Sequence, residues 1–142
     1  MKNRKKGFSL VELLIVLAVM AALIATITPV ALNAIKKSKA TQVAQNLKTL
    51  ASALENAAYV NGIDTTTGNI KNATGGSIAL QDLGRDIKSA DYAIYYTGSG
   101  GTYTANIVYK GEGDIGIIDD TLAQATTKTF NDVSGSGFTP LT

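Results

Sequence analysis

The stretch KKGFSLVELLIVLAVMAALIATI, residues 5–27, decides the fold of the N-terminal part of this chain. It opens a run of 25 residues, from Phe8 to Leu32, in which Glu12 is the only charged side chain. A helix of about 20 apolar residues crosses the hydrocarbon core of a bilayer, because each residue adds about 1.5 Å. The run is therefore long enough to span a membrane, and the carboxylate inside it needs an explanation.

A removable secretory signal is the alternative interpretation of this run. Such a signal has an apolar core of about 7 to 15 residues and ends at a small-residue cleavage site. Here the core is longer, and helical sequence follows Leu32. We therefore favour a retained membrane helix.

An amphipathic pattern continues directly from the apolar run. Its apolar residues recur in steps of four and three, and alanines widen the same stripe: Val43, Leu47, Leu50, Leu54 and Ala57, with Ala40, Ala44, Ala51 and Ala58. This spacing predicts a helix with one apolar face. Asn61 and Gly62 supply the stop, and Gly62 is expected in the left-handed conformation. Residues 8–60 would then form one helix of 53 residues, about 80 Å long.

Pro29 lies inside this predicted helix. It removes the hydrogen bond to the carbonyl of Ala25, so we expect a kink or a weak turn there. A kink that a membrane helix merely tolerates and a kink with a function are both open interpretations.

Composition excludes several classes of site. The chain has no cysteine and no histidine, which removes disulfides, thiol metal sites and the commonest general base. The net charge of +2 is set by four basic residues among the first seven; the rest of the chain carries nine basic and eleven acidic residues. Nothing indicates a nucleic-acid surface, which needs a lasting basic patch. We expect no catalysis and no cofactor.

Residues 61–142 predict a small head with nine acidic and five basic residues. The polar, glycine-rich segment 61–77 predicts a surface loop, and residues 77–89 a short helix. Two β-rich segments, 92–97 and 102–110, flank a four-residue loop of glycine and serine and predict a hairpin.

Alternation in the second of these strands predicts one inward face, carried by Tyr103, Ala105, Ile107 and Tyr109 and packed on the helix stripe. Further strands are expected at 115–118 and 126–130, with a loose tail after Val133. The predicted fold class is α+β: one long N-terminal helix and a head with a small antiparallel sheet of three or four strands.

Two candidate sites lie in the head. Glu112, Asp114, Asp119 and Asp120 cluster in a glycine-containing turn, and carboxylates with loop carbonyls are Ca²⁺ ligands. Their spacing matches no EF-hand, so a solvated acidic loop is the interpretation we favour. The six tyrosines allow an adhesive or conductive set, but most fall on strand positions, which favours packing.

A short basic leader, then Gly7, then Phe8-Ser9-Leu10-Val11-Glu12 and about twenty apolar residues resembles the type III signal of type IV pilins and the related pseudopilins. Pro29 stands where many members have a proline. The resemblance is close over residues 5–32. From there to Val60 it extends only to the general pattern of an amphipathic helix. It implies three parts: a cytoplasmic leader (1–7), a long helix (8–60, with 8–32 in the membrane or filament core and 33–60 amphipathic) and the head (61–142).

The resemblance also implies a life cycle. A membrane-embedded prepilin peptidase would cut between Gly7 and Phe8, and the new amino group of Phe8 would be methylated. The ammonium of an incoming subunit would then neutralise Glu12 of a neighbour, and Phe8, Glu12 and Pro29 would be the assembly residues. The alternative for Glu12 is a place at the membrane interface, exposed to headgroups and water.

Location and partners follow from the same resemblance. Four basic residues precede the span, whereas Lys36, Lys37 and Lys39 follow it, so charge alone gives only a slight bias towards a cytoplasmic N-terminus. The implied partners are further copies of the chain, the peptidase, the membrane, and an inner-membrane platform with its ATPases. The implied product is a surface pilus. A periplasmic pseudopilus for secretion or DNA uptake, and a permanently anchored binding domain, are the alternatives.

Two departures from the family pattern leave the subfamily open. The cysteine pair that closes a C-terminal loop in many pilins is absent. We also find no aromatic and proline-containing segment of the kind expected in a major type II secretion pseudopilin.

Overall fold

The computed structural model describes residues 7–64, 68–99, 101–113, 116–118, 122 and 139–141. The chain divides into two compact units, Met1–Lys37 and Ser38–Thr142. We call the first the apolar unit and the second the globular unit. One helix, α1, supplies residues to both.

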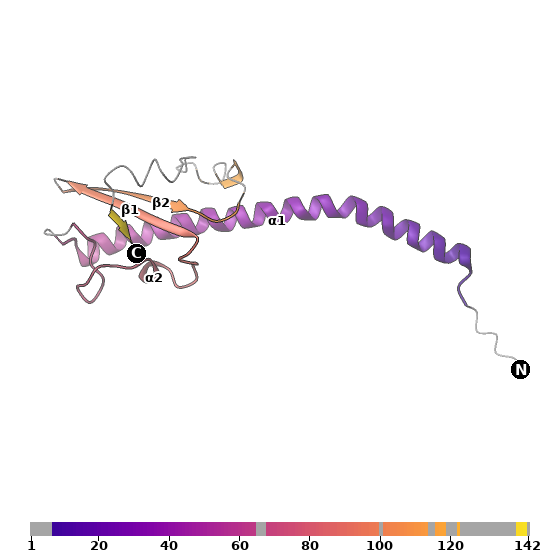
Figure 1. Cartoon of the computed structure of the whole chain (residues 1–142), viewed down its shortest axis with the longest axis horizontal. Helices are drawn as coiled ribbons and strands as arrows, with labels where there is room; N and C mark the ends of the chain where they lie inside the picture. Colours follow the sequence, from indigo (N-terminus) through magenta and orange to yellow (C-terminus); the bar gives the residue numbers. More distant parts are fainter. Residues whose placement is uncertain are drawn as a thin grey trace, which may run out of the picture. The chain divides into compact units, whose positions relative to one another are not determined.

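Helix α1 runs from Leu10 to Asn61, 52 residues, and contains Pro29. Figure 1 shows it as one continuous ribbon. It begins two residues after the predicted start at Phe8, because Ser9 caps its first turn. It ends directly before Gly62, whose φ of 76° confirms the predicted left-handed residue.

The globular unit holds a three-stranded antiparallel sheet, which with α1 confirms the α+β fold class. Strand β1 is Tyr92–Ser99, β2 is Thr102–Tyr109 and β3 is Thr139–Leu141, in the order β2-β1-β3. Figure 1 shows β1 and β2 running alongside the C-terminal part of α1. The strands pair from Tyr92 with Tyr109 to Ser99 with Thr102, so two residues join them instead of the predicted four. The second of these, Gly101, has a φ of 87°, as a tight turn requires.

Two predictions for the C-terminal part of the chain are wrong where the structure describes it. Residues 116–118 form a helical turn and not a strand. Residues 139–141, expected in a loose tail, form β3 and pair with the edge of β1. That pairing is a long-range event, which a three-residue segment does not reveal by its own pattern. The predicted strand at 126–130 lies outside the described residues.

The core of the globular unit lies between α1 and β1. Leu50 of α1 and Ile94 of β1 are completely buried, and the predicted stripe supplies the other buried residues of α1: Ala40, Val43, Ala44 and Leu54. Ala51 is exposed and Ala53 packs partly against the core, contrary to the prediction for Ala51. Ala53 points only about 60° away from Leu50 around the helix, whereas Ala51 points about 100° away.

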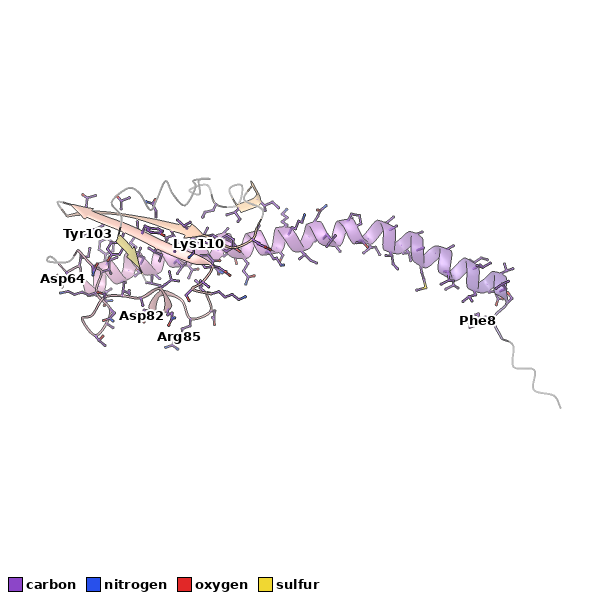
Figure 2. The ribbon with its side chains drawn as sticks, viewed as in Figure 1. Phe8, Asp64, Asp82, Arg85, Tyr103 and Lys110 are labelled. Atoms are coloured by element: carbon purple, nitrogen blue, oxygen red, sulfur yellow. The ribbon has the colours of Figure 1, made fainter. Side chains whose placement is uncertain are left out.

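The predicted inward face of β2 is only half correct. Ile107 and Tyr109 pack against the core. Tyr103, nearer the hairpin end, is 43% exposed, and Ala105 is exposed as well. Figure 2 places Tyr103 towards one end of β2 and Lys110 after the other. The hairpin end of β2 therefore extends beyond the hydrophobic core.

The segment between α1 and β1 is more ordered than the predicted surface loop. Isolated bridges pair Ile63 with Ile70 and Lys71 with Ser77. The amide of Asn72 accepts from the backbone N–H of Gly76 over 2.8 Å and donates to the carbonyl of Ser77 over 3.3 Å. The short helix predicted within 77–89 is α2, Leu80–Leu83.

Candidate functional site

The apolar unit presents an uncovered hydrophobic surface. The large apolar side chains of α1 from Leu10 to Ile35 are between 47% and 74% exposed. Among the described residues, α1 is also the one helix long and apolar enough to cross a membrane, and its most apolar window is not buried. Soluble proteins rarely expose apolar patches of this extent, so this surface needs lipid or protein to cover it.

Glu12 is the one charged residue between Phe8 and Ile35, and it lies in the first turn of α1. Its position there is chemically favourable, because a helix start has unpaired N–H groups and the positive end of the helix dipole. The sequence identified Glu12 as exceptional by its charge alone. The structure adds what the carboxylate touches.

Ser9 and Glu12 form two reciprocal hydrogen bonds. The backbone N–H of Ser9 donates to Glu12 Oε2 over 3.1 Å, and the backbone N–H of Glu12 donates to Ser9 Oγ over 3.2 Å. This arrangement is a capping box, in which the N-cap residue and the third helical residue satisfy one another's N–H groups. Ser9 was not singled out from the sequence, although Ser-x-x-Glu before an apolar run is the recognised signal for this motif.

Gly7 and Phe8 lie before the helix. Neither is helical, and the Phe8 side chain is 87% exposed. Figure 2 shows Phe8 at the N-terminal end of α1. A side chain built on Gly7 would meet nothing within 4 Å, so the Gly7–Phe8 peptide bond is open on that side. Phe8 therefore precedes the helix, because Ser9 caps α1 and the helix begins at Leu10.

The helix around Pro29 satisfies its polar side chains internally. Thr28 Oγ1 donates to the carbonyl of Ile24 over 2.7 Å, and Thr26 Oγ1 donates to the carbonyl of Leu23 over 3.0 Å. Pro29 has no N–H for the carbonyl of Ala25. Hydroxyls that bond to their own helix present no unpaired donor to lipid, which suits a membrane environment.

The calcium candidate falls mostly outside the described residues. Asp114, Asp119 and Asp120 lie there, whereas Glu112 is described and exposed. The backbone carbonyl of Glu112 accepts a hydrogen bond from the hydroxyl of Tyr109 over 3.0 Å. No group of three or more potential metal ligands occurs within the described ranges.

Three tyrosines have structural roles in the globular unit. Tyr92 accepts a hydrogen bond from Asn46 Nδ2 over 3.1 Å, and its ring lies 5.1 Å from that of Tyr109 at an angle of 49°. Tyr96 donates to Asn69 Oδ1. Burial raises the pKa of the Tyr92, Tyr96 and Tyr109 hydroxyls above the usual value. These contacts confirm the packing interpretation for these three residues.

An open groove runs between the C-terminal turns of α1 and the segment that carries α2. Ala53 and Ala57 line it on the helix side, with Asn61 at the helix end; Asp82 and Arg85 line the other side. Figure 2 shows Asp82 and Arg85 on the α2 side of the globular unit. In its lining, the Thr74 hydroxyl donates to Asn72 Oδ1 over 2.8 Å, and the Asp82 carboxylate accepts from the backbone N–H of Ala79 over 3.0 Å.

Comparison with protein-family models gives a match at the N-terminus of the chain. Residues 2–28 match the prokaryotic N-terminal methylation motif, which is the signal motif of type IV pilins and pseudopilins. Proteins that carry this motif are structural subunits. No curated protein and no solved structure gave a significant match.

Proposed function

We propose that this chain is a prepilin whose mature form polymerises through the N-terminal part of α1 into a type IV pilus on the cell surface. The methylation motif supports a prepilin of the pilin or pseudopilin type. The observation that carries the proposal is the exposed apolar surface from Leu10 to Ile35, which no described residue of the chain covers. Lipid covers it in the single-pass precursor, and helices of other subunits cover it in the filament.

Processing begins at the bond between Gly7 and Phe8. The peptidase needs an accessible peptide bond, and this one precedes the helix and meets no side chain at Gly7. Cleavage removes the basic leader, residues 1–7, and leaves an ammonium on Phe8 that is then methylated. The charges that would hold the N-terminus in the cytoplasm are removed at the same step.

Assembly pairs two charges that are costly to bury alone. A carboxylate inside a membrane costs about 3 kcal/mol at the bilayer centre unless it is paired. The Phe8 ammonium of an incoming subunit neutralises Glu12 of its neighbour, and this contact fixes the axial register. Lys36, Lys37 and Lys39 become a solvated ring on the filament or contact headgroups before assembly.

Partner proteins supply the peptide cleavage and the energy that assembly of this chain requires. A prepilin peptidase cuts the leader, and an inner-membrane platform with its ATPases drives extension. The chain itself works as a structural subunit and not as an enzyme. A short periplasmic pseudopilus of a secretion or DNA-uptake system is the competing product of the same assembly reaction.

One experiment tests this proposal. The full chain is expressed with a prepilin peptidase and an assembly system, and sheared surface material is analysed by electron microscopy and by mass spectrometry of the N-terminus. We expect filaments whose subunits begin at methylated Phe8. Glu12→Ala should abolish them while the protein accumulates in the membrane, and Glu55→Ala, a matched change at an exposed acid of α1, should not.

Recovery of subunits that begin at Met1 would refute the processing step. Filaments found only in the periplasm would favour the pseudopilus. If Glu12→Ala formed filaments in normal amounts, the proposed pairing between Glu12 and the Phe8 ammonium would be refuted.

A further inference from the structure

Before assembly, when no second subunit is present, the Glu12 carboxylate lies in an apolar segment without the ammonium of a neighbour. Residues 13–35 contain no charged side chain that could pair with it, and the nearest basic residues in the sequence are Lys5 and Lys6 of the leader. The uncut chain also has no free ammonium on Phe8. An ionisable group in a membrane segment is costly unless a partner satisfies it. Cleavage removes these lysines with the leader, so Glu12 needs a local partner that the mature chain keeps.

The capping box supplies that partner. The backbone N–H of Ser9 donates to one carboxylate oxygen of Glu12, and the Ser9 hydroxyl accepts from the Glu12 N–H, so the cap residue and the first turn of α1 are held together. The positive end of the helix dipole adds to the stabilisation of the carboxylate. The bond to Ser9 uses Oε2, and no hydrogen bond between described residues reaches the second oxygen, Oε1, which can therefore accept from a cation.

We propose that Ser9 is a positioning residue for assembly: its hydroxyl caps the first turn of α1 and so fixes the turn in which the backbone N–H of residue 9 holds the Glu12 carboxylate for the ammonium of a second copy of this chain. This inference rests on the function proposed above and names the device that prepares its central contact. Ser9 acts through Glu12 and does not itself touch the incoming subunit.

The same geometry favours pairing between subunits over pairing within one. In the uncut chain Phe8 lies before the cap and outside the helix. Glu12 already has a donor from its own chain in Ser9. The ammonium released by cleavage is therefore left to seek the carboxylate of a neighbour, which is the contact that builds a polymer.

The test separates the cap from the charge with four variants of the full chain. Ser9→Ala removes the hydroxyl and keeps the charge of Glu12, and Ser9→Thr is its conservative control. Glu12→Gln keeps a side chain that completes a capping box but removes the charge, and Glu12→Ala removes both. Mass spectrometry first establishes that each variant is cut at Phe8, since Ser9 is next to the cleavage site.

Two readouts are then compared. Amide hydrogen exchange of residue 12, measured by NMR in detergent micelles, reports the cap, and the yield of sheared filaments reports assembly. We expect Ser9→Ala to accelerate exchange about fivefold and to lower filament yield by a similar factor. Ser9→Thr should restore both. Glu12→Gln should keep the slow exchange and yield no filaments.

Three outcomes would overturn the inference. Ser9→Ala keeps the backbone N–H that bonds to Glu12 Oε2, so filaments of this variant in normal yield would show that the hydroxyl half of the cap does not position Glu12 for assembly. Failure of Ser9→Thr to restore the yield, or a block at cleavage in Ser9→Ala, would assign Ser9 another role. A wild-type chain that is cut but forms no filaments would overturn the proposed function as well, and slow exchange at residue 12 would then leave the cap as a purely structural feature.

Discussion

The two halves of α1 both carry apolar side chains, but only one half buries them within the described part of the chain. In the half from Leu10 to Ile35, every large apolar side chain is at least 47% exposed. In the half that begins at Ala40, Leu50 is fully buried and Leu54 is 4% exposed, because β1 and the segment around α2 cover them. One helix thus carries two apolar surfaces, and the described part of the chain supplies a cover for the second alone.

Because of this difference, we expect the covered half to determine the stability of the globular unit and the uncovered half to determine membrane insertion and assembly. Substitutions in the covered half should be measured as a loss of folding free energy in the globular unit. Substitutions in the uncovered half should leave that free energy unchanged and act on membrane insertion or assembly. All six tyrosines lie between residues 59 and 109, so tyrosine near-ultraviolet circular dichroism of the full chain in detergent reports the globular unit alone.

The largest effect on the globular unit is expected from Leu50→Ala. It leaves a cavity in the core that also contains Ile94 and should cost about 2–5 kcal/mol of unfolding free energy in a urea titration. Leu23→Ala is the matched change in the uncovered half, where the side chain is 53% exposed. Equal losses for the two variants would break the comparison.

A smaller loss is expected from Tyr96→Phe. The Tyr96 hydroxyl donates to Asn69 Oδ1 and thereby ties β1 to the segment that follows α1. Its removal should cost about 1 kcal/mol, measured in the same titration. Tyr103→Phe, at a side chain that is 43% exposed, is the control and should be neutral. A neutral Tyr96→Phe would show that this tie is not needed.

Alkaline pH should weaken the globular unit and spare the apolar unit. Burial raises the pKa of Tyr92, Tyr96 and Tyr109 above 10.0, so these hydroxyls stay protonated in the folded state after the unfolded chain has begun to ionise. The folded state then binds more protons, and stability falls as pH rises from about 10 through the raised values. Thermal melts between pH 7 and 11 should show this fall, and Tyr92→Phe should reduce it. A melting temperature that stays constant up to pH 11 would contradict the role of burial.

The smallest effect on the globular unit is expected from Pro29→Ala. Alanine restores an N–H for the carbonyl of Ala25, so amide exchange near residue 29 should slow in micelles. The urea midpoint of the globular unit should not move, because Pro29 lies in the uncovered half. A shifted midpoint would show that the two halves unfold together.

Local patterns predicted the parts of the fold that local forces determine. The apolar run, the amphipathic stripe, the stop at Gly62 and the β1–β2 hairpin all follow from composition and spacing within short windows. The errors have tertiary causes. Ala51, predicted in the stripe, is exposed, because the covering elements bury the side of the helix that carries Ala53. Strand β3 depends on a partner, β1, about forty residues away in sequence.

The candidate site was predictable in part for a similar reason. Glu12 is evident as a lone charge in an apolar run, and Gly7 and Phe8 are evident from the motif. The Ser9 cap is also a local signal, but its meaning appears only when the helix is seen to start at Leu10. Pairing between subunits involves a second chain, so no pattern within one chain reports its geometry.

A cryo-electron microscopy structure of the filament tests the central claim most directly. We predict that the Phe8 nitrogen of each subunit lies within about 4 Å of a Glu12 carboxylate oxygen on a neighbour, with the surface from Leu10 to Ile35 buried in the filament core. A structure in which these two groups lie far apart, each facing lipid or water alone, would contradict the account.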